Sequence, residues 1–283
     1  MKLMTYQKLM CDGFELNYCI KGQGQPILVV GSSVYYPRLF SEDFYQHFQV
    51  IFLDHRGFGK PAQAFTQEDY TLNKIVKDME YARQILQLDN LIVLGHSGHA
   101  FMAMAYAKAY PQHVQKLVLL NTATSNSQER QQQSLSYFEA HASMERKHQF
   151  AHEIALLEQD LKKEPERRFV HMCIRMGAHS FYDFMFNATS MWDNVHPNME
   201  IIDYLWGVAF AEQNLLQQML QVNKPIFLGL GRYDYLVAPI SLWDTVDHIP
   251  HVKKVIFEKG GHNPMFEEPV FFKEQLIQWI NEG

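Results

Sequence analysis

Three side chains of the kind that carry out nucleophilic catalysis are spread along the chain: a serine, a carboxylate and a histidine. Ser97 stands between the apolar run 91–94 and a helical pattern. A serine on a strand-to-helix turn presents its hydroxyl where a base and a carbonyl substrate can reach it. This hydroxyl is a weak nucleophile unless a histidine takes its proton and an acid orients that histidine. Asp234 and His262 each follow a later predicted strand, so they are the candidate partners.

The turn around Ser97 has steric requirements that test this interpretation. Because neighbouring backbone crowds such a turn, small residues are expected two positions before and two positions after the serine. Gly95 meets this requirement and His99 does not, although Gly98 and Ala100 on either side of His99 are small. The pattern predicts a nucleophile turn in which His99 replaces the small residue expected two positions after the serine. A serine that only caps a helix is the alternative.

Short apolar strands alternate with helical patterns around these residues. The predicted strands cover 27–30, 50–53, 91–95, 117–120, 225–230 and 254–257. The predicted helices cover 38–48, 71–86, 98–110, 241–246 and 269–281. Continuous apolar strands joined by helices are typical of a parallel sheet, whose carboxyl-terminal edge then carries the functional loops. Residues 5–21 add an antiparallel hairpin with its turn at Asp12-Gly13.

The alternation stops at about residue 122 and resumes at about 222. We therefore predict an α/β fold with a mostly parallel twisted sheet, flanking helices and an inserted helical cap. The core comprises 1–121 and 222–283, and the cap comprises 122–221. The cap segment holds seven of the fourteen methionines and twelve aromatic residues. Most of these should form the core of the cap itself, and a minority should give the cleft an apolar, adaptable wall.

The composition restricts the partners of the chain. Of its 283 residues, 47% are hydrophobic and 20% are charged, so disorder is not indicated. A net charge of -6 provides no basic surface for nucleic acid or an anionic membrane. We expect a small-molecule substrate and a monomer or homodimer. No apolar run approaches membrane-spanning length, so a cytoplasmic location is predicted.

Neither the cysteines nor the histidines indicate a cofactor or a metal. Cys11, Cys19 and Cys173 are odd in number and lack a C-x-x-C spacing. His141, His148 and His152 would share one helix face, but His152-Glu153 is not followed by the second histidine of a zinc protease motif. A solvated or packing role is the simpler interpretation of this stripe.

Four ordered sequence blocks resemble those of the α/β-hydrolase family. They are the nucleophile block 95–98, the D-x-R-G-x-G block 54–59, the acid block 231–234 and the histidine block 261–269. The similarity covers about 1–121 and 222–283. It implies an α/β-hydrolase fold with Ser97 as nucleophile, His262 as base and then acid, and Asp234 as the residue that orients His262.

The same resemblance implies an oxyanion hole formed by the backbone N–H groups of Gly98 and Ser32. Losing one such donor typically costs about 10²–10³ in rate. Many relatives have His-Gly where this chain has Val30-Gly31, so other groups must brace the loop that carries Ser32. We also expect side chains that line the substrate site, at Ser33, Tyr35, His99, Trp192 and Met265.

These expectations favour a serine hydrolase that cleaves a carboxylic ester, bulky and apolar or a lactone, through an acyl-enzyme. Ser97 argues against the family members that use an aspartate nucleophile, such as haloalkane dehalogenases and epoxide hydrolases. The alternatives are a proline iminopeptidase-like aminopeptidase, a macrolide-type lactone esterase, a C–C bond hydrolase and a homologue that binds a ligand without turnover.

Overall fold

A computed structural model describes residues 5–282, so residues 1–4 and 283, at the outer ends of the predicted core, lie outside the described residues. The strands are β1 (Gln7–Cys11), β2 (Phe14–Lys21), β3 (Gln25–Gly31), β4 (Phe48–Asp54), β5 (Lys60–Pro61), β6 (Leu91–His96), β7 (Val114–Leu120), β8 (Ile226–Gly231) and β9 (Val252–Phe257). The helices are α1 (Leu72–Ile85), α2 (His99–Ala109), α3 (Gln128–His141), α4 (Met144–Lys163), α5 (Arg168–Arg175), α6 (Gly177–Ser180), α7 (Met199–Tyr204), α8 (Leu215–Gln221), α9 (Pro264–Glu267) and α10 (Pro269–Asn281). A 3₁₀ helix covers Ile240–His248, where the sequence predicts a helix over 241–246.

The strands form one mixed sheet in the order β1-β2-β4-β3-β6-β7-β8-β9, with β5 paired to β2. From β4 to β9 every pairing is parallel, as the apolar runs predict, and β2 is antiparallel to both of its long neighbours. The β1–β2 hairpin turns at Asp12 and Gly13, both with positive φ, 45° and 84°. A two-residue turn of this kind needs positive φ at both positions, which explains the Asp-Gly pair.

Successive residues of the central strands point to opposite faces of the sheet. Leu28 and Val30 of β3 belong to the buried cluster that contains the inner sides of α1 and α2. Ile27 and Val29 belong to the cluster that contains α10. Both faces are therefore covered, and this is why the central runs of these strands, 27–30, 50–53, 91–94 and 117–120, are continuously apolar.

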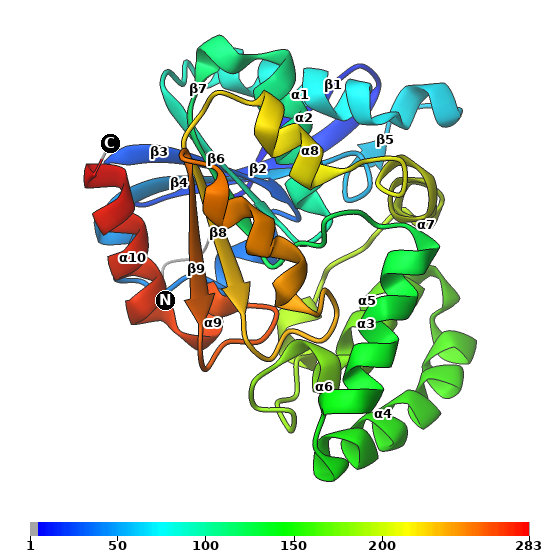
Figure 1. The fold of residues 1–283 in the computed structure, drawn as a ribbon. Helices are drawn as coiled ribbons and strands as arrows, with labels where there is room; N and C mark the ends of the chain where they lie inside the picture. Colours follow the sequence, from blue (N-terminus) through cyan, green and yellow to red (C-terminus); the bar gives the residue numbers. More distant parts are fainter. Residues whose placement is uncertain (1–4, 283) are drawn as a thin grey trace.

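The inserted segment lies partly over one end of the sheet and partly against the core. Figure 1 shows α3 to α6 gathered beyond the arrowheads of β8 and β9, at the carboxyl ends of the strands. In contrast, α8 contacts α2, and its Leu215 and Met219 share the buried cluster of the core helices. The helices over the strand ends form the cap that faces the candidate site.

The predicted helix over 38–48 is wrong. Two short 3₁₀ turns, Tyr36–Arg38 and Phe44–Gln46, take its place, and β4 already begins at Phe48. The ring of Phe44 stacks on Phe272 of α10, with centroids 5.6 Å apart. Packing of aromatic side chains against a distant helix outweighs the local helical preference here.

Candidate active site

Ser97 occupies the sharp turn between β6 and α2. Its φ is 56°, in the left-handed region that non-glycine residues rarely adopt, and its N–H donates to Leu120 O at 2.9 Å. A Cβ on Gly95 would lie 2.6 Å from Ala100 Cα and from the carbonyl oxygen of His99. The turn therefore requires glycine at position 95. The atom of His99 that crowds this position is a backbone oxygen, which any residue at position 99 would provide.

Asp234 and His262 form a buried pair at the ends of β8 and β9. His262 Nδ1 donates to Asp234 Oδ2 at 2.7 Å, and the two residues are 8% and 1% exposed. Asp234 Oδ1 accepts the N–H of Leu236 at 3.0 Å. With Nδ1 held by Asp234, the other ring nitrogen, Nε2, is the one that can exchange a proton with a serine hydroxyl.

Asn121, directly after β7, joins the acid to the loop 261–263, which carries His262. Its Nδ2 donates to Asp234 Oδ2 at 2.7 Å and to Gly261 O at 2.8 Å. Because both partners are acceptors, the amide nitrogen must face them. Asn121 was not among the residues predicted from the sequence, although its position at the end of a predicted strand on the same sheet edge was a usable signal.

The loop 261–263 is held on several sides. His262 donates its N–H to Ser180 O of the cap. Glu267 Oε1 accepts the N–H groups of Gly261 and Asn263, each at 3.0 Å, and its Oε2 accepts the N–H of Tyr182 at 2.7 Å. Burial raises the pKa of Glu267 to about 7 against the opposing effect of these three donors.

The loop after β3 is braced by Asp54, at the end of β4. Asp54 Oδ1 accepts the N–H of Ser33 at 2.6 Å, and Asn17 donates to Oδ2. The Ser32 hydroxyl accepts the N–H of Tyr35 at 3.2 Å. These bonds supply the bracing that Val30-Gly31 lacks, and they keep Ser32 on the wall of the cavity between the sheet edge and the cap.

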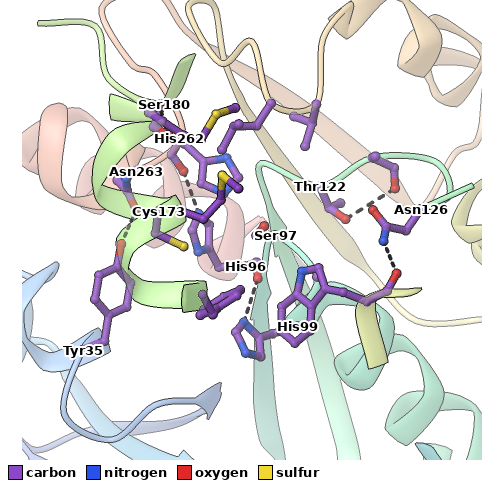
Figure 2. A pocket seen from close by; sticks show the side chains of 18 of the residues that line it. Tyr35, His96, Ser97, His99, Thr122, Asn126, Cys173, Ser180, His262 and Asn263 are labelled. Atoms are coloured by element: carbon purple, nitrogen blue, oxygen red, sulfur yellow. Dashed lines mark hydrogen bonds between the residues drawn. The ribbon is translucent and has the colours of Figure 1, made fainter. Parts of the chain in front are cut away.

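A cavity of about 500 Å³ lies between the sheet edge and the cap, and Ser97 and His262 both line it. In Figure 2, Tyr35, Cys173 and Asn263 lie on one side of Ser97, and Thr122 and Asn126 lie on the other. Its apolar walls are built mainly by Phe58, Phe101, Phe169, Met172, Met176, Phe181, Trp192, Trp206, Leu236 and Val237. None of the lining residues, all within 5–282, is aspartate, glutamate, lysine or arginine.

Comparison with known proteins decides the family. A family model of the alpha/beta hydrolase fold matches residues 9–269. Over 272 residues the chain is 55% identical to the AB hydrolase superfamily protein YclE of Bacillus subtilis (strain 168), covering 96% of this chain and 97% of that protein. The chain belongs to the α/β-hydrolase family.

Two solved structures resemble this α/β-hydrolase over almost its full length. A proline iminopeptidase from Mycobacterium smegmatis has a TM-score of 0.73 at 15% identity, with 98% of both chains covered. The esterase EaEST from Exiguobacterium antarcticum has a TM-score of 0.68 at 18% identity, with 99% of this chain and 100% of that chain covered. At such low identity the likeness shows the fold and leaves the substrate unassigned.

The α/β-hydrolase places three of the five expected substrate-lining residues on the cavity wall: Tyr35, His99 and Trp192. Tyr35 stacks on Trp192 with ring centroids 4.1 Å apart, which joins the core to the cap. Ser33 and Met265 are not among the described residues that line the cavity. Asp54 draws the backbone of Ser33 inward, and Met265 is buried in the cluster around α10.

Two further wall residues of this α/β-hydrolase, Phe169 and Trp206, come from the cap and were not predicted individually from the sequence. Trp206 lies in a π-helical turn, Leu205–Ala209, and approaches Gly98 so closely that a Cβ there would lie 2.8 Å from its ring. Phe169 packs between Trp206 and Trp192, with centroid distances of 5.4 and 5.9 Å. The abundance of aromatic residues in the cap was the available signal, but it did not distinguish inner from outer positions.

The described part of this α/β-hydrolase, residues 5–282, contains no group of three or more His, Cys, Asp or Glu side chains arranged to hold a metal ion. Over the same residues, no helix has both the length and the apolar character needed to cross a membrane.

Proposed function

We propose that this α/β-hydrolase is a serine esterase that cleaves a bulky, apolar carboxylic ester or a lactone through an acyl-enzyme. The observation that carries the proposal is the cavity, which has a volume of about 500 Å³, is walled by aromatic and methionine side chains and has Ser97 and His262 on its surface. Among the described residues that line it, none is aspartate, glutamate, lysine or arginine. A neutral, apolar substrate suits such a site, because burying a charge without a partner is costly.

In the proposed reaction, Ser97 Oγ attacks the substrate carbonyl carbon while His262 Nε2 takes the serine proton. The N–H groups of Gly98 and Ser32 hold the oxyanion that forms. As the intermediate collapses, the bond to the alcohol oxygen breaks and His262 returns the proton to that oxygen. Water then attacks the acyl-enzyme with His262 again as base, which releases the acid and restores Ser97. Asp234 keeps the histidine in the required tautomer, supported by the 2.7 Å contact.

The same cavity weighs against an aminopeptidase. A proline iminopeptidase-like substrate carries a free amino group that is cationic at neutral pH, and a buried ammonium needs carboxylate partners. No lining residue within 5–282 provides one. Two of the lining histidines are kept neutral, because burial lowers the pKa of His96 well below its usual range and that of His99 to about 4.

The test is steady-state hydrolysis of nitrophenyl esters with acyl chains from acetyl to decanoyl, alongside prolyl and alanyl nitroanilides. Wild type, Ser97→Ala and Ser241→Ala are compared, the last as a control because Ser241 is an exposed serine outside the cavity lining. We expect ester turnover with an optimum at medium or long chains. It should fall at least about 10⁴-fold in Ser97→Ala and stay unchanged in Ser241→Ala.

The other outcomes distinguish the alternatives. Turnover of the anilides would favour the aminopeptidase, and a strict preference for acetyl esters would refute the bulky substrate. If no ester is hydrolysed, macrolide-type lactones and C–C bond substrates should be tested next. A lack of turnover of those substrates as well would favour a ligand-binding homologue. The proposal retains the predictions of a cytoplasmic location, a small-molecule partner and a monomer or homodimer.

A further inference from the structure

A chain of hydrogen bonds runs behind Ser97 from the loop after β4 to the backbone of His262. Its two ends define the protonation of the rings. The N–H of Gly57 donates to His55 Nδ1 at 3.0 Å, so His55 carries its proton on Nε2. His96 Nε2 lies 2.6 Å from His262 O, and a carbonyl oxygen can only accept, so His96 also carries its proton on Nε2.

The middle of the chain agrees with both ends. His55 Nε2 lies 3.2 Å from His99 Nε2, so His55 donates and His99 must carry its own proton on Nδ1. His99 Nδ1 lies 2.8 Å from the Tyr36 hydroxyl oxygen and donates to it. Tyr36 then donates its hydroxyl proton to His96 Nδ1 at 3.1 Å. The carbonyl oxygen of His96 is a second, more distant acceptor for two of these donors, at 3.2 Å from His99 Nδ1 and 3.5 Å from the Tyr36 hydroxyl. Both contacts are consistent with the same donors, so the direction of donation is the same throughout.

The surroundings keep the histidines of this hydrogen-bond chain neutral and closely packed. Burial lowers the pKa of His55 and His96 well below the usual range and that of His99 to about 4. Two glycines make room for the rings: a Cβ on Gly31 would lie 2.1 Å from the Tyr36 ring, and one on Gly57 would lie 2.6 Å from the His55 ring. A protonated imidazole would present a donor where the chain requires an acceptor.

We propose that His96 is a positioning residue for His262, held in its Nε2–H tautomer by the hydrogen-bond chain through Tyr36 and His99 to His55. This rests on the proposed function, in which His262 transfers the proton. The carbonyl of His262 is then held by His96 while its N–H is held by Ser180 O. Both backbone groups of the base are anchored, and a displacement of about 1 Å at such a group can cost about 10²-fold in rate.

A matched pair of variants tests the role of His96. In His96→Gln the side-chain amide extends to the position of Nε2, so it can still donate to His262 O. In His96→Asn the amide ends near the position of Nδ1 and cannot. We expect His96→Asn to lower kcat about 10- to 100-fold with KM within about twofold, and His96→Gln to recover most of kcat. Equal losses in the two folded variants, or a loss confined to KM, would overturn the proposal.

A measurement on the wild type needs neither substrate nor variant. Two-bond ¹H–¹⁵N correlation spectra distinguish the two neutral tautomers of each histidine. We expect Nε2–H for His55 and His96 and Nδ1–H for His99, unchanged between about pH 6 and about pH 8. A His99 proton on Nε2, or titration of His96 in that range, would refute the proposed hydrogen-bond chain. If the tautomers agree but Ser97→Ala retains activity, the proposed function fails and the hydrogen-bond chain stands.

Discussion

Asn121 donates one N–H of its side-chain amide to Asp234 Oδ2 at 2.7 Å and the other to the carbonyl oxygen of Gly261 at 2.8 Å. A single nitrogen at the end of β7 thus connects the loop after β8 with the loop after β9. The carboxylate that holds His262 and the backbone just before His262 share this anchor. The relative position of the acid and the histidine therefore depends on a third strand.

Removing this amide should slow the chemical step. Asn121 has a φ of 44°, so glycine is the appropriate replacement, because alanine would add backbone strain. We expect Asn121→Gly to lower kcat about tenfold with little change in KM, since substrate contacts remain. Steady-state kinetics on the best nitrophenyl ester measure this. Asn126→Gly is the control, since Asn126 bonds to Trp206 O at a distance from the acid and should mainly affect KM. An unchanged kcat in Asn121→Gly would contradict the anchoring role.

Two glycines beside Ser97 should respond differently to alanine. A Cβ at Gly95 would meet backbone of α2 at 2.6 Å, whereas a Cβ at Gly98 would meet the side chain of Trp206 at 2.8 Å. Backbone cannot give way easily, so Gly95→Ala should lower the free energy of unfolding by about 1–3 kcal/mol or more and reduce kcat. Gly98→Ala should have the smaller effect on Tm and mainly reduce kcat/KM by crowding the cavity. Thermal unfolding and ester kinetics test the pair, and equal Tm losses would show that this steric distinction is wrong.

The length of substrate accepted should change when the cap wall is opened. Phe169 packs between Trp206 and Trp192 and lines the cavity. We expect Phe169→Ala to raise the ratio of kcat/KM for decanoyl over acetyl esters about tenfold, because the freed volume admits more methylenes. Phe271→Ala is the matched control on α10, where the side chain is 37% exposed and not a lining residue. The same chain-length profile in both variants would mean that Phe169 does not limit the cavity.

The buried carboxylate of Glu267 should make stability depend on pH. Burial raises its pKa from 4.5 to about 7, so between these values the folded chain holds more proton at this site than the unfolded chain. The contribution of Glu267 to the free energy of unfolding is therefore greatest near pH 4.5 and decreases as the pH rises toward about 7. In Glu267→Gln this contribution is absent.

The measurement is the Tm of wild type minus the Tm of Glu267→Gln as a function of pH. We expect this difference to decrease between about pH 4.5 and about pH 7 and to level off outside that range. Glu274→Gln, at an exposed position of α10, should show no such trend. A difference that instead grows with pH would mean that the three N–H donors to Glu267 outweigh its burial.

The sequence alone determined those features that depend on neighbouring residues. Continuous apolar runs predict the parallel strands, Asp12-Gly13 predicts the hairpin turn, and the small residue at Gly95 predicts the tight turn at Ser97. Asp234 and His262 could be selected because parallel strands bring their carboxyl ends to one edge. These signals are local, since hydrophobic period and backbone conformation depend on a few adjacent residues.

Only the tertiary structure decided which side chains meet. Tyr36 contacts His96 and His99 across some sixty positions of sequence, and Glu267 reaches the cap at Tyr182. A hydrogen bond requires two atoms about 3 Å apart, and that distance depends on the packing of whole elements. The same reason explains the wrong helix over 38–48, where Phe44 packs on α10. Local sequence thus predicted where the candidate catalytic groups lie, whereas long-range packing determined what orients them and how large the cavity is.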